Sequence, residues 1–243
     1  MAADQGRIHG VVLMVELGDL REGIMPDDVD AVARHVAELP NIVLRGIGTN
    51  LACHSGIAPD AQNMAELSAL AISLEARLGT TFDIVSGGNS ANLNWALGDE
   101  GVGRINDLRL GESILLGREP LDRRTVDGLR TDGFTLVAEV IESKVKPTRP
   151  WGEVHQNAFG AVASPHDLGD APRAILAVGR QDLDPAGLVP PEGVEILGSS
   201  SDHLIVTAAA CPAVGREMAF RVDGYGALLA AMTSPFVSRS YQR

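Results

Sequence analysis

The sequence predicts an α/β fold in which a parallel αβ region is followed by a C-terminal β domain. In the first half, apolar segments of strand length alternate three times with helical segments, which is the pattern of a parallel sheet with outer helices. From about residue 130 the chain carries strand-like segments separated by prolines and no long helix, which is typical of an antiparallel, barrel-like β domain. We therefore expect two domains, residues 1–129 and 130–243.

The first strand is expected at Gly10–Leu17, where the continuous apolar run GVVLMVEL suits a strand buried on both faces. A polar loop, Gly18–Gly23, follows it. Pro26 then begins a helix, because proline fits the first helical turn and apolar residues recur on one face after it. This helix is expected to end at Pro40.

The second strand–loop–helix unit has the same form. Its strand is expected at Ile42–Ile47 and leads into a loop at Gly48–Gly56. A long helix from about Pro59 to Leu78 then carries apolar side chains at helical spacing, and Gly79 is its expected stop.

The third strand, Phe82–Val85, is followed by the most informative stretch of the chain. The chain turns through two glycines, and Asn89 and Ser90 open a short helical run, Ala91–Leu97. Amides freed at a helix start, a serine hydroxyl and glycines that permit close approach together suit a phosphate. By itself, such a run more commonly marks an ordinary strand-to-helix turn in which Ser90 is the N-cap.

A second loop favours the phosphate interpretation. Arg109 offers a guanidinium, and Gly111 and Glu112 follow it with backbone amides that are expected to be free. In an αβ barrel the loops at the carboxyl ends of the strands form the site, and phosphate is often held by the late loops. A phosphate held by neutral donors beside a fixed arginine suits a phosphorylated aromatic cofactor. Alone, Arg109 would be interpreted as a surface arginine.

Beyond residue 130 the expected elements are short strands joined by proline-containing loops. We expect these strands at Thr135–Ser143, Ala174–Val178, Val194–Leu197, His203–Ala208 and Glu217–Val222.

The composition excludes several classes of partner. A net charge of −12 and a pI near 4.9 argue against nucleic acid or an anionic membrane surface, and 4% aromatic residues leave few side chains for stacking bases. Cys53 and Cys211 lie far apart without metal-type spacing, as expected for free thiols in a reducing cytoplasm. With no membrane-length apolar run and no secretion signal, we expect a cytoplasmic protein.

Seven ordered segments carry a resemblance to a known family: GDLREG, GIGTNLAC, SGGNS, LRLGESILLGRE, AILAVGRQD, SSDHLIV and YGALLAAMTSP. Over essentially the whole chain they resemble the alanine/ornithine racemase family of fold-type III pyridoxal 5′-phosphate (PLP) enzymes. The resemblance implies a TIM-like αβ barrel that binds PLP, here incomplete because its N-terminal strands are missing, and a C-terminal β domain that completes the site across a homodimer. It also implies an isomerase that interconverts L- and D-amino acids by proton exchange at Cα.

The resemblance assigns the cofactor phosphate to Asn89, Ser90 and the amides of Gly111 and Glu112. Arg109 matches the arginine that faces the pyridine nitrogen. Such an arginine keeps the nitrogen unprotonated, which favours simple proton exchange at Cα over other carbanion chemistry.

Three further residues are candidates for cofactor contact. By resemblance, Asn50 contacts the ring and Arg21 lies near the cofactor's 3′ oxygen. Tyr241, near the C-terminus, is a candidate for the phosphate. No metal site is expected, because the histidines share no ligand spacing; those considered are His54, His155, His166 and His203.

One departure from the family concerns the Schiff-base lysine, which in the family lies on the first barrel strand, upstream of every matched segment. Lys144 and Lys146 are the lysines of this chain, and we interpret them as solvated charges at a strand end. Residues 1–7 resemble the tail of a helix. We therefore expect that about the first third of the family's length is absent, that the catalytic lysine is not in this chain, and that the chain alone is inactive.

The second proton-transfer residue is also unassigned. Residues 151–160 align with a segment that, in alanine racemases, brings a tyrosine base from the neighbouring subunit, and no tyrosine is present here. Asn157 stands where the ornithine-racemase-like branch has an aspartate, and an amide cannot act as a general base.

The leading hypothesis is therefore a PLP-dependent racemase acting on alanine, ornithine or a related amino acid. Another fold-type III activity, such as amino-acid decarboxylation, is the alternative within enzymes. From a different class, the chain could be a non-catalytic module that binds PLP or phosphate without the lysine.

Overall fold

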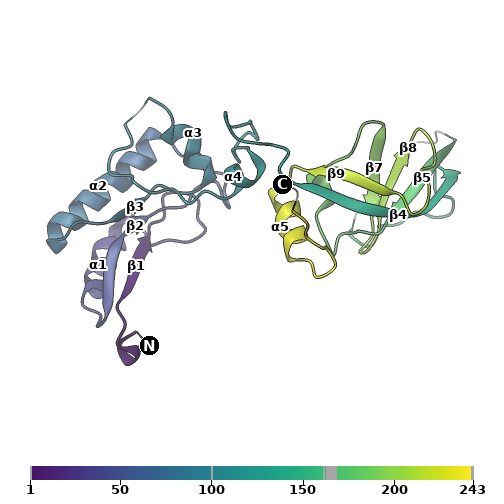
Figure 1. Ribbon diagram of the computed structural model, residues 1–243. Coiled ribbons are helices and arrows are strands. Elements are labelled where there is room, and N and C mark those ends of the chain that lie inside the picture. Colours follow the sequence, from purple (N-terminus) through teal and green to yellow (C-terminus); the bar gives the residue numbers. More distant parts are fainter. Residues whose placement is uncertain (1, 100, 161, 163–168, 242–243) are drawn as a thin grey trace. The chain divides into compact units, whose positions relative to one another are not determined.

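The computed structural model describes residues 2–99, 101–160, 162 and 169–241. The chain forms two compact units, Met1–Arg130 and Thr131–Arg243 (Figure 1). The first unit contains parallel strands with helices, and the second contains an antiparallel sheet. These two architectures confirm the predicted fold class, a partial αβ barrel and a separate β domain.

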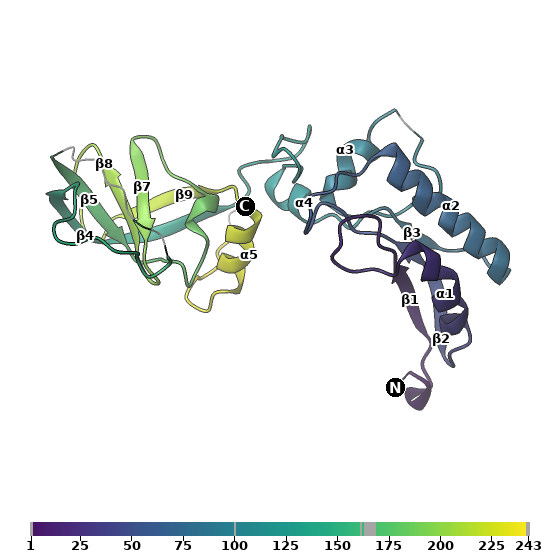
Figure 2. The same ribbon diagram turned by 180° about the vertical axis from the view of Figure 1, so that it is seen from behind.

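The first unit is built on three parallel strands, β1 (His9–Met14), β2 (Ile42–Gly48) and β3 (Ile84–Ser86), in sequential order. Helix α1 (Val29–Ala37) joins β1 to β2, and helix α2 (Ala61–Leu78) joins β2 to β3. Both helices pack against β2 and contact each other (Figures 1 and 2). Sequential parallel strands with neighbouring outer helices are the arrangement of an αβ barrel, whereas a doubly wound sheet reverses its strand order.

Short elements complete the first unit: η1 (Ala3–Gln5), η2 (Pro26–Asp28), η3 (Ser90–Asn92), α3 (Leu93–Ala96) and α4 (Glu112–Leu116). Residues 106–109 extend the parallel pairing beyond β3. Asp107 forms a parallel bridge with Ser86, and the amide of Arg109 donates to the carbonyl of Gly88 at 2.9 Å. Arg109 is therefore held beside the turn that follows β3.

Local signals explain the bounds of α2. Asp60 is its N-cap and accepts from the amide of Asn63 at 2.8 Å, while the Asn63 side chain accepts from the amide of Asp60. Gly79 ends the helix in a left-handed conformation that glycine adopts at little cost. The predicted stop is confirmed, and the predicted start is within two residues.

The core of the first unit lies between the sheet and the two helices. Val15, Ile47 and Val85 are fully buried there and pack against Met64 and Leu67 of α2. Burying this apolar surface is the main favourable contribution to folding of the unit.

The first strand is shorter than predicted. Its predicted range was Gly10–Leu17, but the chain leaves the sheet after Met14 because Ile24 folds back beside it. The amide of Ile24 donates to the carbonyl of Met14 at 2.8 Å, and the amide of Glu16 donates to the carbonyl of Ile24 at 3.0 Å. Residues 16–23 therefore form a closed loop at the end of β1.

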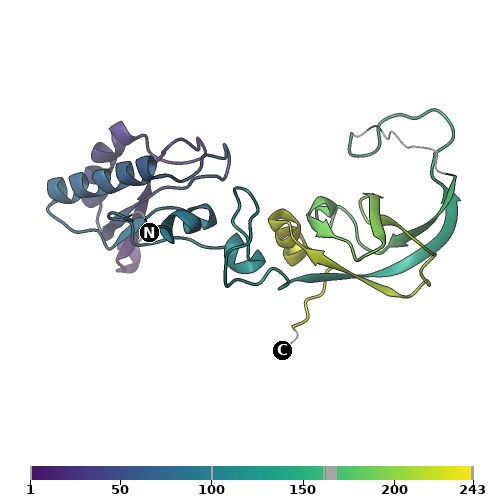
Figure 3. The same ribbon diagram turned by 90° about the horizontal axis from the view of Figure 1, so that it is seen from above.

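The second unit is a six-stranded antiparallel sheet in the order β6-β9-β4-β5-β8-β7. Its strands are β4 (Thr135–Pro147), β5 (Asp170–Leu176), β6 (Leu188–Val189), β7 (Val194–Ser199), β8 (Leu204–Ala208) and β9 (Glu217–Val222). The long strand β4 pairs with β9 through Thr135–Glu139 and with β5 through Val140–Pro147 (Figure 3). The five predicted strands are confirmed, with shifted ends except at β9.

Four elements of the described chain were not predicted: α4, η4 (Pro185–Gly187), β6 and helix α5 (Tyr225–Thr233). Helix α5 is almost entirely apolar, so it shows no helical periodicity. Strand β6 has only two residues and follows the 3-10 turn η4. In the described part of the chain, no helix combines the length and apolar character needed to cross a membrane.

We predict that Gly46→Ala strongly destabilises the first unit. A Cβ at Gly46 would lie 1.7 Å from the carbonyl oxygen of Ile84, so β2 and β3 would have to separate. The free energy of unfolding, measured by urea denaturation, should fall by about 3 kcal/mol or more. Gly198→Ala is the control, because a Cβ at this strand glycine meets no atom within 4 Å. Similar stability of the two variants would contradict the close approach.

Candidate functional site

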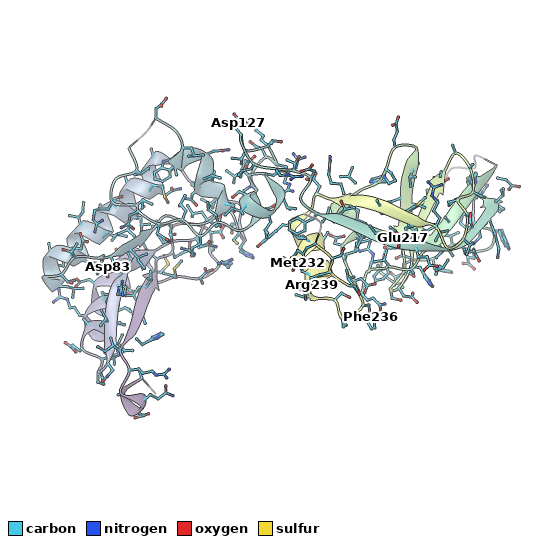
Figure 4. The ribbon with its side chains drawn as sticks, in the orientation of Figure 1. Asp83, Asp127, Glu217, Met232, Phe236 and Arg239 are labelled. Carbon is cyan, nitrogen blue, oxygen red and sulfur yellow. The ribbon has the colours of Figure 1, made fainter. Side chains whose placement is uncertain are left out.

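The candidate residues of the first unit gather where β1, β2 and β3 end, at the carboxyl edge of the sheet. This is the edge at which αβ barrels form their sites. The opposite edge has a structural role: Asp83, labelled in Figure 4, precedes β3 and forms an ion pair with Arg45.

Ser90 joins the turn after β3 to the start of α4. Its hydroxyl is buried and accepts from the amides of Gly111 at 3.2 Å and Ser113 at 3.1 Å. The prediction of a free amide at Gly111 is therefore wrong, because this amide is used to join the two loops. The N-cap of η3 is Asn89 rather than Ser90, since the Asn89 side chain accepts from the amide of Ala91 at 2.8 Å. The Ser90 hydroxyl is thereby available to link the two loops.

Two amides at this junction lack a partner. The N–H groups of Ser90 and Glu112 open η3 and α4, and neither donates to an acceptor among the described residues. The Glu112 carboxylate points elsewhere and pairs with Arg123. The junction therefore offers unsatisfied donors beside a hydroxyl, which is the chemistry of an oxyanion site.

Arg109 is held by neutral groups alone. Its Nη1 donates to the hydroxyl of Ser86, and its Nη2 donates to the carbonyl of Thr49 at 2.9 Å and to Asn50 Oδ1 at 3.3 Å. No carboxylate of the described chain lies within ion-pair distance of Arg109. Its charge is still felt nearby: it is one of the causes that lower the pKa of Glu22, after the larger effect of Arg21.

Asn50 lies between two sets of donors. One atom of its buried amide group is 3.0 Å from Nδ2 of Asn89 and 3.3 Å from Nη2 of Arg109, and the other is 2.7 Å from Nη2 of Arg21. The amide has a single acceptor atom, so in either orientation it satisfies the donors on one side only. Around Asn50, the facing donors therefore outnumber the acceptor that its amide offers, which suits a ligand rich in acceptors.

Arg21 is anchored by Glu22 and Cys53. Its guanidinium forms an ion pair with Glu22 and donates from Nη1 to Cys53 Sγ at 2.8 Å. The hydrogen bond to Glu22 raises the pKa of Arg21 above its usual range and lowers that of Glu22. Arg21 thus remains charged next to Asn50.

Asp19 was not among the predicted site residues, although it is fully buried at this edge. Its carboxylate accepts from the amides of Cys53 at 3.2 Å, His54 at 2.9 Å and Ser55 at 3.0 Å. Burial alone would raise the pKa of Asp19, but these amides outweigh it and hold the pKa below its ordinary value. A sequence signal existed, since Asp19 belongs to the GDLREG segment beside Arg21.

Tyr241 belongs to the second unit, and its side chain is 90% exposed. The same unit carries exposed Phe236 and Arg239 near the end of the described chain (Figure 4).

The two lysines keep exposed side-chain surface, as interpreted from the sequence, and the structure adds that both form ion pairs. Both lie in β4 and contact the carboxylate of Glu142, with Lys144 Nζ at 3.0 Å. Asn157 accepts from the amide of Phe159 at 2.9 Å and so organises its own turn. Of the histidines considered, His166 lies outside the described residues.

Comparison with known proteins identifies relatives of this chain. The family described as "Alanine racemase, N-terminal domain" matches residues 1–119. An ornithine racemase from Acetoanaerobium sticklandii is 40% identical over 238 residues, which cover 96% of this chain and 67% of that protein. A lysine racemase from Thermotoga maritima is 40% identical over 235 residues, covering 96% and 65%.

Solved structures share the fold. Alanine racemase from a D-cycloserine-producing Streptomyces lavendulae has a TM-score of 0.62 at 20% identity, covering 96% of this chain and 63% of that one. Alanine racemase from Bartonella henselae, solved with covalently bound pyridoxal phosphate, has a TM-score of 0.58 at 18% identity, covering 92% and 60%. The chain thus spans about two thirds of the length of its curated relatives.

We predict that the stability contributed by Asp19 depends on pH. Because the folded pKa is depressed, this stability is present above the unfolded value of about 4 and is lost as pH falls through the folded pKa. Asp19→Asn should lower the free energy of unfolding by about 2 kcal/mol at pH 7, with a smaller difference below pH 4.

Urea denaturation of both proteins from pH 7 to pH 3 measures this difference. Asp27→Asn, at an exposed aspartate, is the control and should have little effect. A difference that stays constant over the whole range would show that the Asp19 charge is not held by the amides.

Proposed function

This chain belongs to the alanine racemase family, and we propose that it holds the cofactor of a PLP-dependent amino-acid racemase. The proposed substrates are amino acids with a basic side chain, because the relatives at 40% identity are named ornithine and lysine racemases. The proposed reaction is interconversion of the L and D forms by proton exchange at Cα.

The junction at Ser90 carries this proposal. A phosphate needs several donors at close range, and the free amides of Ser90 and Glu112 lie beside a hydroxyl that joins both loops. In the proposed complex these amides and the Ser90 hydroxyl bind the PLP phosphate. Asn89 supports them indirectly, by capping η3 and by donating to the carbonyl of Leu51 at 2.7 Å.

Arg109 is proposed to face the pyridine nitrogen. A guanidinium does not give up its proton. Neutral acceptors hold the Arg109 guanidinium in place, so its positive charge is not neutralised by a carboxylate. Opposite such a group, a ring nitrogen stays unprotonated. When bound, PLP withdraws electrons from the Cα–H bond, and a less electron-withdrawing ring favours simple proton exchange over other reactions.

Asn50 and Arg21 are proposed to bind the 3′ oxygen side of the cofactor. An oxygen placed there would accept from the donors that the single acceptor of Asn50 cannot serve, in addition to their bonds with other groups. This need for an acceptor supports the proposal independently of the phosphate junction.

The proton-transfer residues are proposed to lie outside this group. Lys144 and Lys146 pair with Glu142 in β4, and Asn157 offers no base.

We further propose that the whole protein is a cytoplasmic homodimer in which residues 151–160 approach the neighbouring subunit. Trp151 in this segment is 86% exposed, which supports a role in contact with a partner. Tyr241 remains a proposed phosphate contact.

A non-catalytic PLP-binding module is the second candidate function. This function is favoured because Lys144 and Lys146 both form ion pairs with Glu142, so neither is free to bind PLP covalently. Another fold-type III activity, such as decarboxylation, is disfavoured by the neutral surroundings of Arg109.

We predict that Ser90→Ala weakens PLP binding about tenfold, because a hydroxyl next to a charged phosphate is lost. Binding of pyridoxal, which has no phosphate, should change little. Fluorescence titration of the purified chain with both compounds measures this. Ser68→Ala is the matched control, as Ser68 is a buried serine of α2 whose hydroxyl donates to the carbonyl of Met64. Equal loss of both ligands would contradict the phosphate assignment.

We also predict that the chain alone neither racemises amino acids nor carries PLP on a lysine. The test incubates it with PLP, reduces with borohydride and maps labelled peptides, while optical rotation of L-ornithine, L-lysine and L-alanine is followed. Stoichiometric labelling of Lys144 or Lys146 with turnover would overturn the proposal that the catalytic lysine lies elsewhere, and labelling without turnover would favour the non-catalytic module.

A further inference from the structure

Two loops at the carboxyl edge of the sheet carry one side of the proposed site. The first loop, residues 16–23, follows β1 and contains Arg21. The second loop, residues 51–57, follows β2 directly after Asn50. The spacing of Arg21 and Asn50 therefore depends on how these two loops are joined.

Asp19 forms most of the hydrogen bonds between the loops. Its carboxylate accepts three amides of the second loop, at Cys53, His54 and Ser55, and its carbonyl accepts from the Ser55 hydroxyl at 2.7 Å. The Ile57 amide is a further backbone donor to Asp19, and Arg21 donates to Cys53. A buried charge satisfied by fixed amides tolerates little displacement, because each unmet group would be costly.

Between Asp19 and Gly23 the first loop has few other anchors. Leu20 is 70% exposed, so it packs against little. Gly23 fixes the far end, where its φ of +144° and its contact with the backbone of Val15 and Glu16 leave no space for a Cβ. Arg21 therefore lies between two fixed points, Asp19 and Gly23.

We propose that Asp19 is a positioning residue of the site. By holding the second loop it sets the place of Arg21 relative to Asn50, and so the side of the site that binds an acceptor oxygen. It acts through Arg21 and does not itself contact the ligand. The ligand's identity rests on the proposed function, whereas the joining of the loops does not.

A double-mutant cycle tests this role. The proteins are wild type, Asp19→Asn, Arg21→Ala and the double variant, and the ligand is pyridoxal, which keeps the ring and the 3-hydroxyl but no phosphate. Asp19→Asn should weaken binding about tenfold when Arg21 is present and less than about twofold when it is alanine. An equal loss in both backgrounds would mean a general structural effect and overturn the proposal.

Glu119→Gln is the matched control. Glu119 is also buried and also accepts backbone amides, those of Leu121 at 2.6 Å and Arg124 at 2.8 Å, within the same unit. This substitution should loosen its own loop and leave pyridoxal binding unchanged. If Glu119→Gln weakened pyridoxal binding, loosening any loop would be enough to weaken it, and the proposal would be overturned.

Hydrogen exchange provides a readout that needs no ligand. In Asp19→Asn, amide exchange should rise about tenfold or more in residues 53–55 and also at Gly18 and Ile24, whose hydrogen-bonded amides flank Arg21. Unchanged exchange at Gly18 and Ile24 would overturn the positioning role, even if wild type binds no pyridoxal and the proposed function itself fails. Should Asp19→Asn not fold, Ser55→Ala removes one bond to Asp19 and should raise exchange in both loops by a smaller factor.

Discussion

At Gly46 the backbone of β2 passes so close to β3 that no side chain fits between them, and the site depends on this approach. The contact belongs to a register in which Gly48 lies opposite Ser86, so Thr49 leaves β2 where the turn leaves β3. Arg109 can then bind the Ser86 hydroxyl and the Thr49 carbonyl together. A slip of one residue would turn Ser86 to the other face of the sheet and remove one of these acceptors.

The site attracts acceptors although the chain carries a net charge of −12. The attraction is local, since it comes from amides at element starts and from two arginines with different partners. Arg21 is neutralised by Glu22, whereas Arg109 has hydroxyl, carbonyl and amide oxygens around it. An anionic ligand therefore meets one compensated and one uncompensated cation. Recognition of this kind depends on geometry rather than on the long-range field.

Features specified by neighbouring residues could be predicted from the sequence. The stop of α2 at Gly79 and both ends of β9 were predicted, because capping and alternation are local. Helix α5 was not, because an apolar helix shows no period. Ordered motifs made Ser90 and Arg109 candidates, whereas no role was predicted for Asp19, although it lies in the GDLREG segment. The amides that satisfy Asp19 lie 34 to 36 residues away, so only tertiary packing brings them together.

Strand β4 is synthesised well before one of the two strands that pair with it. Its first half pairs with β9, which ends at Val222, while its second half pairs with the earlier β5. During synthesis the Thr135–Glu139 edge has no partner until β9 has left the ribosome. An unpaired strand edge is prone to pair with other chains, and pairings of long sequence separation form slowly. The incompletely synthesised β domain is therefore the state of this protein that is most prone to aggregate and that most requires chaperones.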